Sequence, residues 1–314
     1  MRSLFKLQYS DTLLTAITTG ISLIAFLYFY FHGQQNLSYD DALSRLNIAR
    51  KIIDSITPGV GQLGSVWLPF PTVLMIPLIW NDFLWHSGIA GAIISGTAFI
   101  FGAVYLKKIT YLITKNLAAS LLVWFIFVSN VNVLLFQTTA MSESLFLFSA
   151  IMTLYFLTKW VLDQKIANFL FAAFFVMIGT LTRYEGYFIL IGSLVTISVR
   201  LIMQNWRNRN FPKIEGMLLL FLSVASYGIF LWCLYCLIFF KNPFIWLNIY
   251  SGGQGTIVPG SSSQRNLLDS FSAYTQVTIW MSGIIVSLLG LIGYAMLVHS
   301  FIKNYYTMQK KFMF

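Results

Sequence analysis

The residues best suited to chemistry in this sequence are two adjacent carboxylates, Asp40 and Asp41, in the segment SYDDALSRLNIARKIIDS, 38–55. A carboxylate beside a bound substrate can accept a proton from an attacking hydroxyl group and so act as a general base. The alternative is that both acids only stabilise the first turn of a helix, to which an acidic side chain contributes about 0.3–1 kcal/mol. Both interpretations place the pair at the start of a helix.

Within this pair, the spacing gives Asp41 two structural partners that Asp40 lacks. Asp41 lies three residues after Ser38, as in an N-cap motif, and four residues before Arg45, as in a helical ion pair. A residue without a structural duty is the better candidate for chemistry. We therefore predict that Asp40 is the general base and Asp41 a supporting acid, with Arg45 among the substrate-binding residues.

Three further ionisable residues interrupt apolar stretches: Glu143 in TTAMSESLFL, and Arg183 and Glu185 in LTRYEGYF. A carboxylate in such a place is costly unless it has a partner or contacts water. A guanidinium group matches phosphate oxygens in a bidentate fork, which makes Arg183 a candidate for binding an anionic lipid headgroup. The alternative for Arg183 is a local ion pair with Glu185. We assign all three residues to substrate binding.

Other common catalytic patterns are absent from the sequence. The three histidines have no metal-ligand spacing, and the C-x-x-C of Cys233 and Cys236 lies in an apolar run without a second pair. There is no P-loop, dinucleotide fingerprint, H-E-x-x-H or G-x-S-x-G motif. The sequence predicts no cofactor and no dedicated metal site.

The composition decides what kind of scaffold positions these residues. Hydrophobic residues make up 58% of the chain and charged residues only 10%, whereas charged residues are about a quarter of a soluble domain. Too little polar surface is left to cover a soluble fold, so we predict an all-α integral membrane protein. The net charge of +10 lies in small groups between apolar runs, which argues against nucleic acid as a partner.

We predict about eight transmembrane helices within a single multi-span domain, 1–314. A span needs about 20 mostly apolar residues, and the candidates are 13–31, 85–106, 117–137, 144–161, 166–182, 186–202, 217–240 and 277–300. The first run lacks a small-residue cleavage site, so we expect a retained span and not a signal peptide. Arg183 and Glu185 divide 166–202, so we expect two short helices that meet at a membrane surface.

Two segments of the first long loop have patterns of their own. Ala42, Leu46, Ala49 and Ile53 recur at helical spacing, which predicts an amphipathic helix lying flat on the outer membrane surface. The apolar stretch 67–80 is short and contains three prolines. It is typical of an interfacial or re-entrant segment.

The basic residues predict the orientation. With a cytoplasmic N-terminus and eight alternating spans, 14 of the 20 Lys and Arg residues lie inside and 6 outside, so both termini are expected in the cytoplasm. The long loops 32–84 and 241–276 then lie outside, together with most of the acidic residues. Function is therefore expected on the outer face, where loops carry polar chemistry on a helical scaffold.

The order of these features resembles the GT-C glycosyltransferases, which are multi-span enzymes that use polyprenyl-phosphate sugars. One span is followed by an outer loop with an acidic pair, a proline-broken segment, the turn TAMSESLFLF and the turn LTRYEGYF. Protein O-mannosyltransferases and the bacterial lipid A aminoarabinose transferase belong to this group. The resemblance covers residue 10 to about residue 280, and it rests on the order of the motifs.

The resemblance implies roles for individual residues. Asp40 takes the place of the catalytic acid and Asp41 that of its acidic neighbour, where the family more often has Glu. Glu143 falls where the family has an acid in the second outer turn, and Arg183 where the lipid A enzyme has a phosphate-binding lysine. The family usually continues through more spans, so we expect a truncated member.

The implied function is the transfer of a sugar from a polyprenyl-phosphate donor to a lipid, glycan or protein acceptor at the outer face of a bacterial or archaeal plasma membrane. Two alternatives stay open. A lipid-linked sugar transporter or flippase would carry polar residues near the bilayer midplane in broken helices. A non-catalytic, truncated member of the fold would keep the scaffold without the activity.

Overall fold

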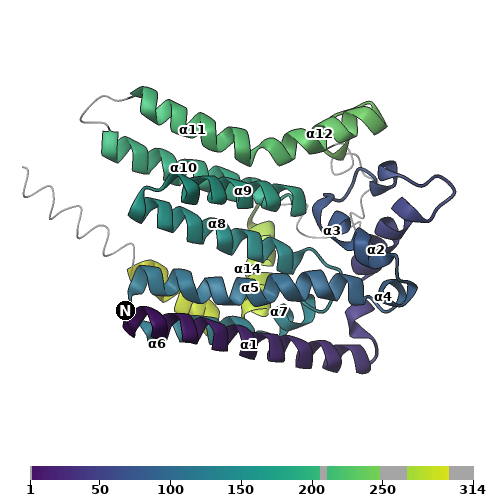
Figure 1. Ribbon diagram of the computed structural model, residues 1–314, viewed down its shortest axis with the longest axis horizontal. Coiled ribbons are helices and arrows are strands. Elements are labelled where there is room, and N and C mark those ends of the chain that lie inside the picture. The colour runs from purple at the N-terminus through teal and green to yellow at the C-terminus, as the bar shows by residue number, and fades with distance from the viewer. Residues whose placement is uncertain (1, 206–210, 248–266, 297–314) are drawn as a thin grey trace, which may run out of the picture. The chain divides into compact units, whose positions relative to one another are not determined.

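The computed structural model describes residues 2–205, 211–247 and 267–296, and all regular elements in these ranges are helices (Figure 1). Contacts divide the chain into two compact units, 1–251 and 252–314, where the sequence predicts one domain. Four helices of the described residues are long and apolar enough to cross a membrane, and six if each bent helix pair counts as one span. The protein is therefore an α-helical multi-pass membrane protein.

The four helices of spanning length all belong to the first unit, and they run alongside one another (Figure 1). They are α1 (Arg2–Phe31), α5 (Ile89–Thr114), α8 (Glu143–Asp163) and α10 (Gly186–Asn205). Helices α1, α8 and α10 cover predicted spans, and α5 overlaps the predicted span 85–106 from Ile89 onward. Long apolar runs without internal breakers satisfy their backbone hydrogen bonds best as helices.

Three other predicted spans form shorter or broken helices. The range 117–137 divides into α6 (Leu117–Val128) and α7 (Val131–Phe136), because the Asn130 side chain accepts hydrogen bonds from the first backbone N–H groups of α7. The range 217–240 divides into α11 (Phe211–Ala225) and α12 (Tyr227–Phe240), which meet at 45°. Helix α9 (Ile166–Thr182) has only 17 residues.

The second unit contains α14 (Leu267–Ser282) and a helix over 284–296, which meet at an angle of 111°. Gly283 lies between them with a φ of 85°, a conformation that is open to glycine because it has no Cβ. The predicted span 277–300 is therefore not one straight helix. Its last residues, and 248–266 of the predicted outer loop 241–276, lie outside the described residues.

The sharp turn between α9 and α10 confirms the predicted break at Arg183–Glu185. Helix α10 begins at Gly186, where an added Cβ would lie 2.5 Å from the backbone oxygen of Gly179. Only glycine allows the two backbones to approach this closely. The charged residues of the turn are thereby held against the end of α9.

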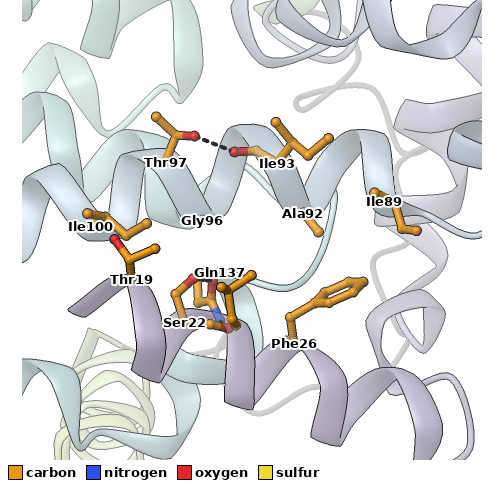
Figure 2. Close-up of a pocket in the computed structure, with 11 residues that line it drawn as sticks. Thr19, Ser22, Phe26, Ile89, Ala92, Ile93, Gly96, Thr97, Ile100 and Gln137 are labelled. Atoms are coloured by element: carbon orange, nitrogen blue, oxygen red, sulfur yellow. Dashed lines mark hydrogen bonds between the residues drawn. The ribbon is translucent and has the colours of Figure 1, made fainter. Parts of the chain in front are cut away.

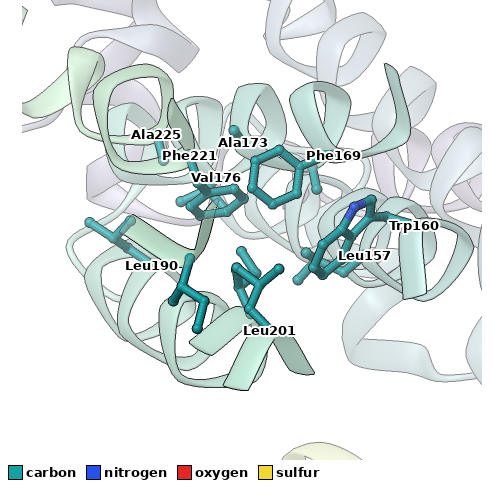
Figure 3. Packing of buried hydrophobic residues seen from close by; sticks show 12 residues of the cluster. Leu157, Trp160, Phe169, Ala173, Val176, Leu190, Leu201, Phe221 and Ala225 are labelled. Atoms are coloured by element: carbon teal, nitrogen blue, oxygen red, sulfur yellow. The ribbon is translucent and has the colours of Figure 1, made fainter. Parts of the chain in front are cut away.

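The largest core of the first unit lies around α9 (Figure 3). Its Phe169 and Val176 are completely buried, and the Phe169 ring lies 4.9 Å from that of Trp160 on α8 and 5.3 Å from that of Phe221 on α11. Aromatic pairs at these separations contribute beyond the area that they bury. The core fixes α9, whose last turn leads to Arg183.

Three short helices gather at one end of α1, α5 and α8 (Figure 1): α2 (Asp40–Ile53), α3 (Phe70–Ile79) and α4 (Asp82–His86). We call this end of the first unit the pocket end, because a cavity described below opens there. The predicted amphipathic helix exists as α2, and the proline-broken segment forms α3 with Pro77 inside it.

The apolar stripe of α2 has a different partner from the predicted one. Ala42, Leu46 and Ala49 are at most 1% exposed and pack with residues of α3 and with Ala90 and Ala140. The stripe therefore contacts protein, because α3 folds back over it and removes its apolar surface from both lipid and water.

Candidate substrate pocket

A cavity of about 320 Å³ opens at the pocket end between α2 and the turn that joins α9 to α10. We call it the substrate pocket. It brings together predicted site residues that are about 140 positions apart in the sequence, and its lining consists of Asp41, Arg45, Trp67, Leu68, Ser142, Thr182, Arg183, Tyr184 and Glu185.

Arg183 contacts three other side chains at the pocket. Its Nη1 lies 2.6 Å from Oε1 of Glu143 and its Nη2 lies 2.7 Å from Oε1 of Glu185. Its Nε donates to both oxygens of Glu185, and Nη1 also donates to Oγ of Ser142. The predicted local pairing of Arg183 with Glu185 is therefore present, and Glu143 completes a cluster of three charges.

The cluster shifts the pKa values of Arg183 and Glu185. Burial lowers the pKa of the Arg183 guanidinium, but hydrogen bonding to Glu185 and the charges of Glu143 and Glu185 raise that pKa above its ordinary value. For the Glu185 carboxyl, burial raises the pKa, because it disfavours the charged form. The hydrogen bonds from Arg183 outweigh this effect and lower the pKa of Glu185 below its ordinary value. Arg183 and Glu185 are therefore held in their charged forms at neutral pH.

Arg45 provides a second guanidinium group on the opposite wall of the pocket. Its side chain is 7% exposed, and its Cζ lies 5.1 Å from the centre of the Trp67 ring. A guanidinium stacked over an indole gains cation–π attraction, which is strongest when both groups are removed from water. Two guanidinium groups and two carboxylates, Asp41 and Glu185, thus line the same cavity.

The two members of the acidic pair differ in position. Both side chains are exposed, but Asp41 lines the pocket and Asp40 is not among the lining residues. In the described part of the chain, neither carboxylate lies within ion-pair distance of a basic side chain. The predicted ion pair of Asp41 with Arg45 is therefore wrong.

The predicted N-cap is also wrong. The cap residue of α2 is Tyr39, which makes no side-chain cap hydrogen bond, and Oγ of Ser38 instead donates to the Gln35 carbonyl. A short 3-10 helix over Gln35–Leu37 precedes Ser38 and provides this acceptor. The structural duties that set Asp41 apart from Asp40 in the sequence are absent from the fold.

Arg50 holds α2 in the orientation that turns Asp41 and Arg45 toward the pocket. Its guanidinium pairs with Asp54 and Asp82 at 2.8 Å each, donates to the Ile79 carbonyl, and lies 4.8 Å from the centre of the Trp85 ring. These contacts join α2 to the end of α3 and to α4. Sequence reasoning missed this role, because a basic residue in the last turn of a helix has the usual explanation of a favourable helix dipole.

Trp67 and Tyr184 were also missed. The Tyr184 hydroxyl donates to the Val66 carbonyl at 3.0 Å, and its ring stacks on Trp246 with centres 5.1 Å apart. These contacts fasten the irregular segment before α3 to the turn after α9. The signal available in the sequence was the position of each aromatic residue next to an ionisable or proline-rich motif.

The donor set of the pocket consists of carboxylate, guanidinium, hydroxyl and indole groups. Within the described residues there is no group of three or more His, Cys, Asp and Glu side chains placed to hold a metal ion. Comparison with family models, with curated proteins and with solved structures finds no match to this chain.

Proposed function

We propose that the protein is a membrane glycosyltransferase that moves a sugar from a polyprenyl-phosphate donor to an acceptor hydroxyl at the pocket end. The observation that carries the proposal is the grouping of Asp41, Arg45 and Arg183 around one cavity at the end of spanning helices. In this proposal the chain crosses the membrane eight times, both termini are cytoplasmic, and the pocket end faces outward.

The pocket has the hydrogen-bonding groups that a sugar phosphate requires. Sugar hydroxyls both donate and accept, so they match the carboxylate of Glu185 and the guanidinium of Arg183. A phosphate oxygen fits the planar fork of Arg45, which lines the pocket above Trp67. Arg45 and Arg183 line the same pocket, so we assign the phosphate to Arg45, with Arg183 adding positive charge at the same site.

The transfer step uses Asp41 as the base. The acceptor oxygen forms a bond to the anomeric carbon, while the bond from that carbon to the phosphate oxygen breaks. The proton of the acceptor passes to the Asp41 carboxylate, and the electron pair of the broken bond leaves with polyprenyl phosphate, whose charge Arg45 stabilises. The sequence favours Asp40 for this proton, but Asp41 lines the pocket, so the fold favours Asp41.

The test is transfer from a radiolabelled polyprenyl-phosphate sugar by the full chain in lipid nanodiscs, with membrane extract as the source of acceptors. Asp41→Asn is expected to lower the rate by about 10²–10⁴-fold, the usual contribution of a general base. Asp40→Asn is the matched control, because it removes the neighbouring charge without changing the pocket. Loss of transfer in Asp40→Asn alone would reverse the assignment, and full rates in both variants would refute the proposal.

A transporter of lipid-linked sugars is the second candidate, favoured by a buried polar segment after α7. Gln137 and Ser142 are at most 2% exposed, and Oε1 of Gln137 accepts a hydrogen bond of 2.7 Å from Ser22, which lies in the middle of the spanning part of α1. Non-helical backbone at such depth occurs where it lies against protein or lines a cavity. Movement of a fluorescent lipid-linked sugar across vesicles without transfer would favour this candidate.

A further inference from the structure

A second group of charged residues lies at the opposite end of α1, α5 and α8 from the substrate pocket. Nζ of Lys107 lies 2.7 Å from Oδ1 of Asp11, and Nζ of Lys108 lies 3.5 Å from Oδ2 of the same residue. Lys107 is only 1% exposed. Two ammonium groups thus share one carboxylate, which leaves one positive charge in excess at the junction of α1 and α5.

Helix α8 adds a third lysine beside this group. Lys108 lies 4.7 Å from the centre of the Tyr105 ring, Tyr105 contacts Tyr155 edge to face at 4.9 Å, and Lys159 lies 5.6 Å from the centre of the Tyr155 ring. Tyrosines beside lysines are characteristic of the level of lipid headgroups, where one end of each side chain is apolar and the other is wet.

Two cavities lie along the junction of α1 and α5, and the first of them begins at these charges. The first, of about 730 Å³, is lined by Asp11, Tyr105 and Lys108 among others, and the second, of about 280 Å³, by mostly apolar residues. Thr19 lines both cavities. We call the two together the α1–α5 groove, which therefore has a charged end and an apolar end.

The apolar end offers hydrocarbon surface despite its few polar residues (Figure 2). Thr19 and Thr97 donate their hydroxyl groups to carbonyls four residues earlier in their own helices, and Ser22 donates to Gln137. These groups need no partner from a ligand. In Figure 2 this end of the groove lies between α5, which carries Ile89 and Ile100, and α1, which carries Thr19 and Phe26.

The groove extends across the depth of a bilayer core, so it is long enough to hold the acyl chain of a lipid from one leaflet. Ile89 and Lys108 are 19 positions apart on α5, or about 28 Å at 1.5 Å per residue, close to the roughly 30 Å of a bilayer core. The charged end thus lies at the level of one layer of headgroups. A lipid with its headgroup at the charged end would therefore have its acyl chain at the depth of the apolar part of the groove.

We propose that the α1–α5 groove binds an anionic phospholipid, with its phosphate at Lys108 and one acyl chain along the apolar end. Basic pockets between transmembrane helices recognise anionic headgroups, and the excess positive charge around Asp11 supplies that recognition. The charged end is also the end at which Lys115 and Lys165 lie. This site is separate from the substrate pocket and does not depend on the proposed transfer activity.

The test measures lipid retained by the full chain after purification, by native mass spectrometry, with equal amounts of phosphatidylglycerol and phosphatidylcholine supplied. The wild-type protein is expected to retain phosphatidylglycerol preferentially. Lys108→Gln should lower this preference about fivefold, as the loss of one basic residue near an anionic headgroup does. The ion pair of Lys107 with Asp11 stays intact in this variant, so the fold is preserved.

Lys115→Gln is the matched control, because it removes one exposed positive charge from the same end of α5 without touching the groove, and it should keep the preference. Ala92→Phe fills the apolar end and should reduce retention of the lipid while Lys108 is unchanged. Equal retention of both lipids by the wild-type protein, or an equal effect of both lysine variants, would overturn the proposal. Displacement of the lipid by millimolar inorganic phosphate would instead identify a site for free phosphate.

Discussion

Nη1 of Arg183 lies 2.6 Å from Oε1 of Glu143, and this ion pair joins the end of α9 to the start of α8. The second oxygen of Glu143, Oε2, is buried and has no hydrogen-bond partner within the described residues. Glu143 therefore depends on Arg183 for compensation of its charge. The ion pair thus holds the Arg183 side chain in place in the wall of the pocket.

Replacement of Arg183 by alanine should lower the stability of the protein. The variant leaves the partly buried carboxylate of Glu143 without its partner, which costs about 1–3 kcal/mol. Arg183→Lys should recover only part of the loss, because an ammonium group cannot hold two carboxylates in a planar fork. Thermal unfolding in detergent measures both effects. An unchanged melting temperature for Arg183→Ala would show that the ion pair has no structural role.

The pH dependence of stability should report on Glu185. Its pKa is lowered below the ordinary value of 4.5, so its contribution is fully present above that value and disappears as the pH falls through the lowered pKa. The melting temperature of the wild-type protein should therefore decline more steeply below about pH 4.5 than that of Glu185→Gln. The effect should be small, because the Glu185 side chain is 51% exposed. Parallel curves for the two proteins would contradict this assignment.

Gly91 should tolerate no side chain. A Cβ at this position would lie 2.8 Å from the backbone nitrogen of Ala140 and would also contact its Cα. Gly91→Ala should push α5 away from the polar segment around Gln137 and destabilise the protein by about 1–3 kcal/mol. Gly20→Ala on α1 is the control, since nothing lies within 4 Å of its added Cβ. If both variants melt at the wild-type temperature, the close approach is not a constraint.

The two ends of α5 should be accessible from opposite sides of the membrane. Ser38 lies at the pocket end and Lys115 follows the last residue of α5, and both are exposed. In a variant without Cys233 and Cys236, a cysteine at position 38 should react with an impermeant maleimide added to intact cells. A cysteine at position 115 should react only after permeabilisation. The reverse pattern would place the pocket end in the cytoplasm.

The helices were predictable where one physical signal dominated. Long apolar runs predicted α1, α5 and α8, of which only α8 agrees closely at both ends, since α1 begins well before residue 13 and α5 ends well after residue 106. The charges at Arg183 and Glu185 located the break between α9 and α10. The bend at Gly283 and the division of α6 from α7 were not predicted. Both depend on local backbone hydrogen bonds and glycine conformation, which a hydropathy pattern does not contain.

The site was predictable in composition but not in arrangement. Five of the six predicted site residues lie in the substrate pocket or bind a residue that lines it, and only Asp40 lies outside. The sequence did not indicate that α3 covers the stripe of α2, since that contact joins segments that each look interfacial alone. The same packing places Asp41 and Arg45 at the pocket, and this is the reason that we propose Asp41, and not the predicted Asp40, as the base.

Because α9 is closely packed, the number of residues in this helix fixes where Arg183 lies relative to the core. α9 contacts α8, α10, α11 and α12, and Arg183 follows its last residue, Thr182. One residue inserted between Phe169 and Thr182 would rotate Arg183 by about 100° around the helix axis and shift it by about 1.5 Å. The guanidinium would then leave Glu143, while the core would still hold Phe169 in place. Natural variants of this chain are therefore expected to exchange side chains along α9 freely at its lipid-facing positions, but to keep its 17 residues without a gap.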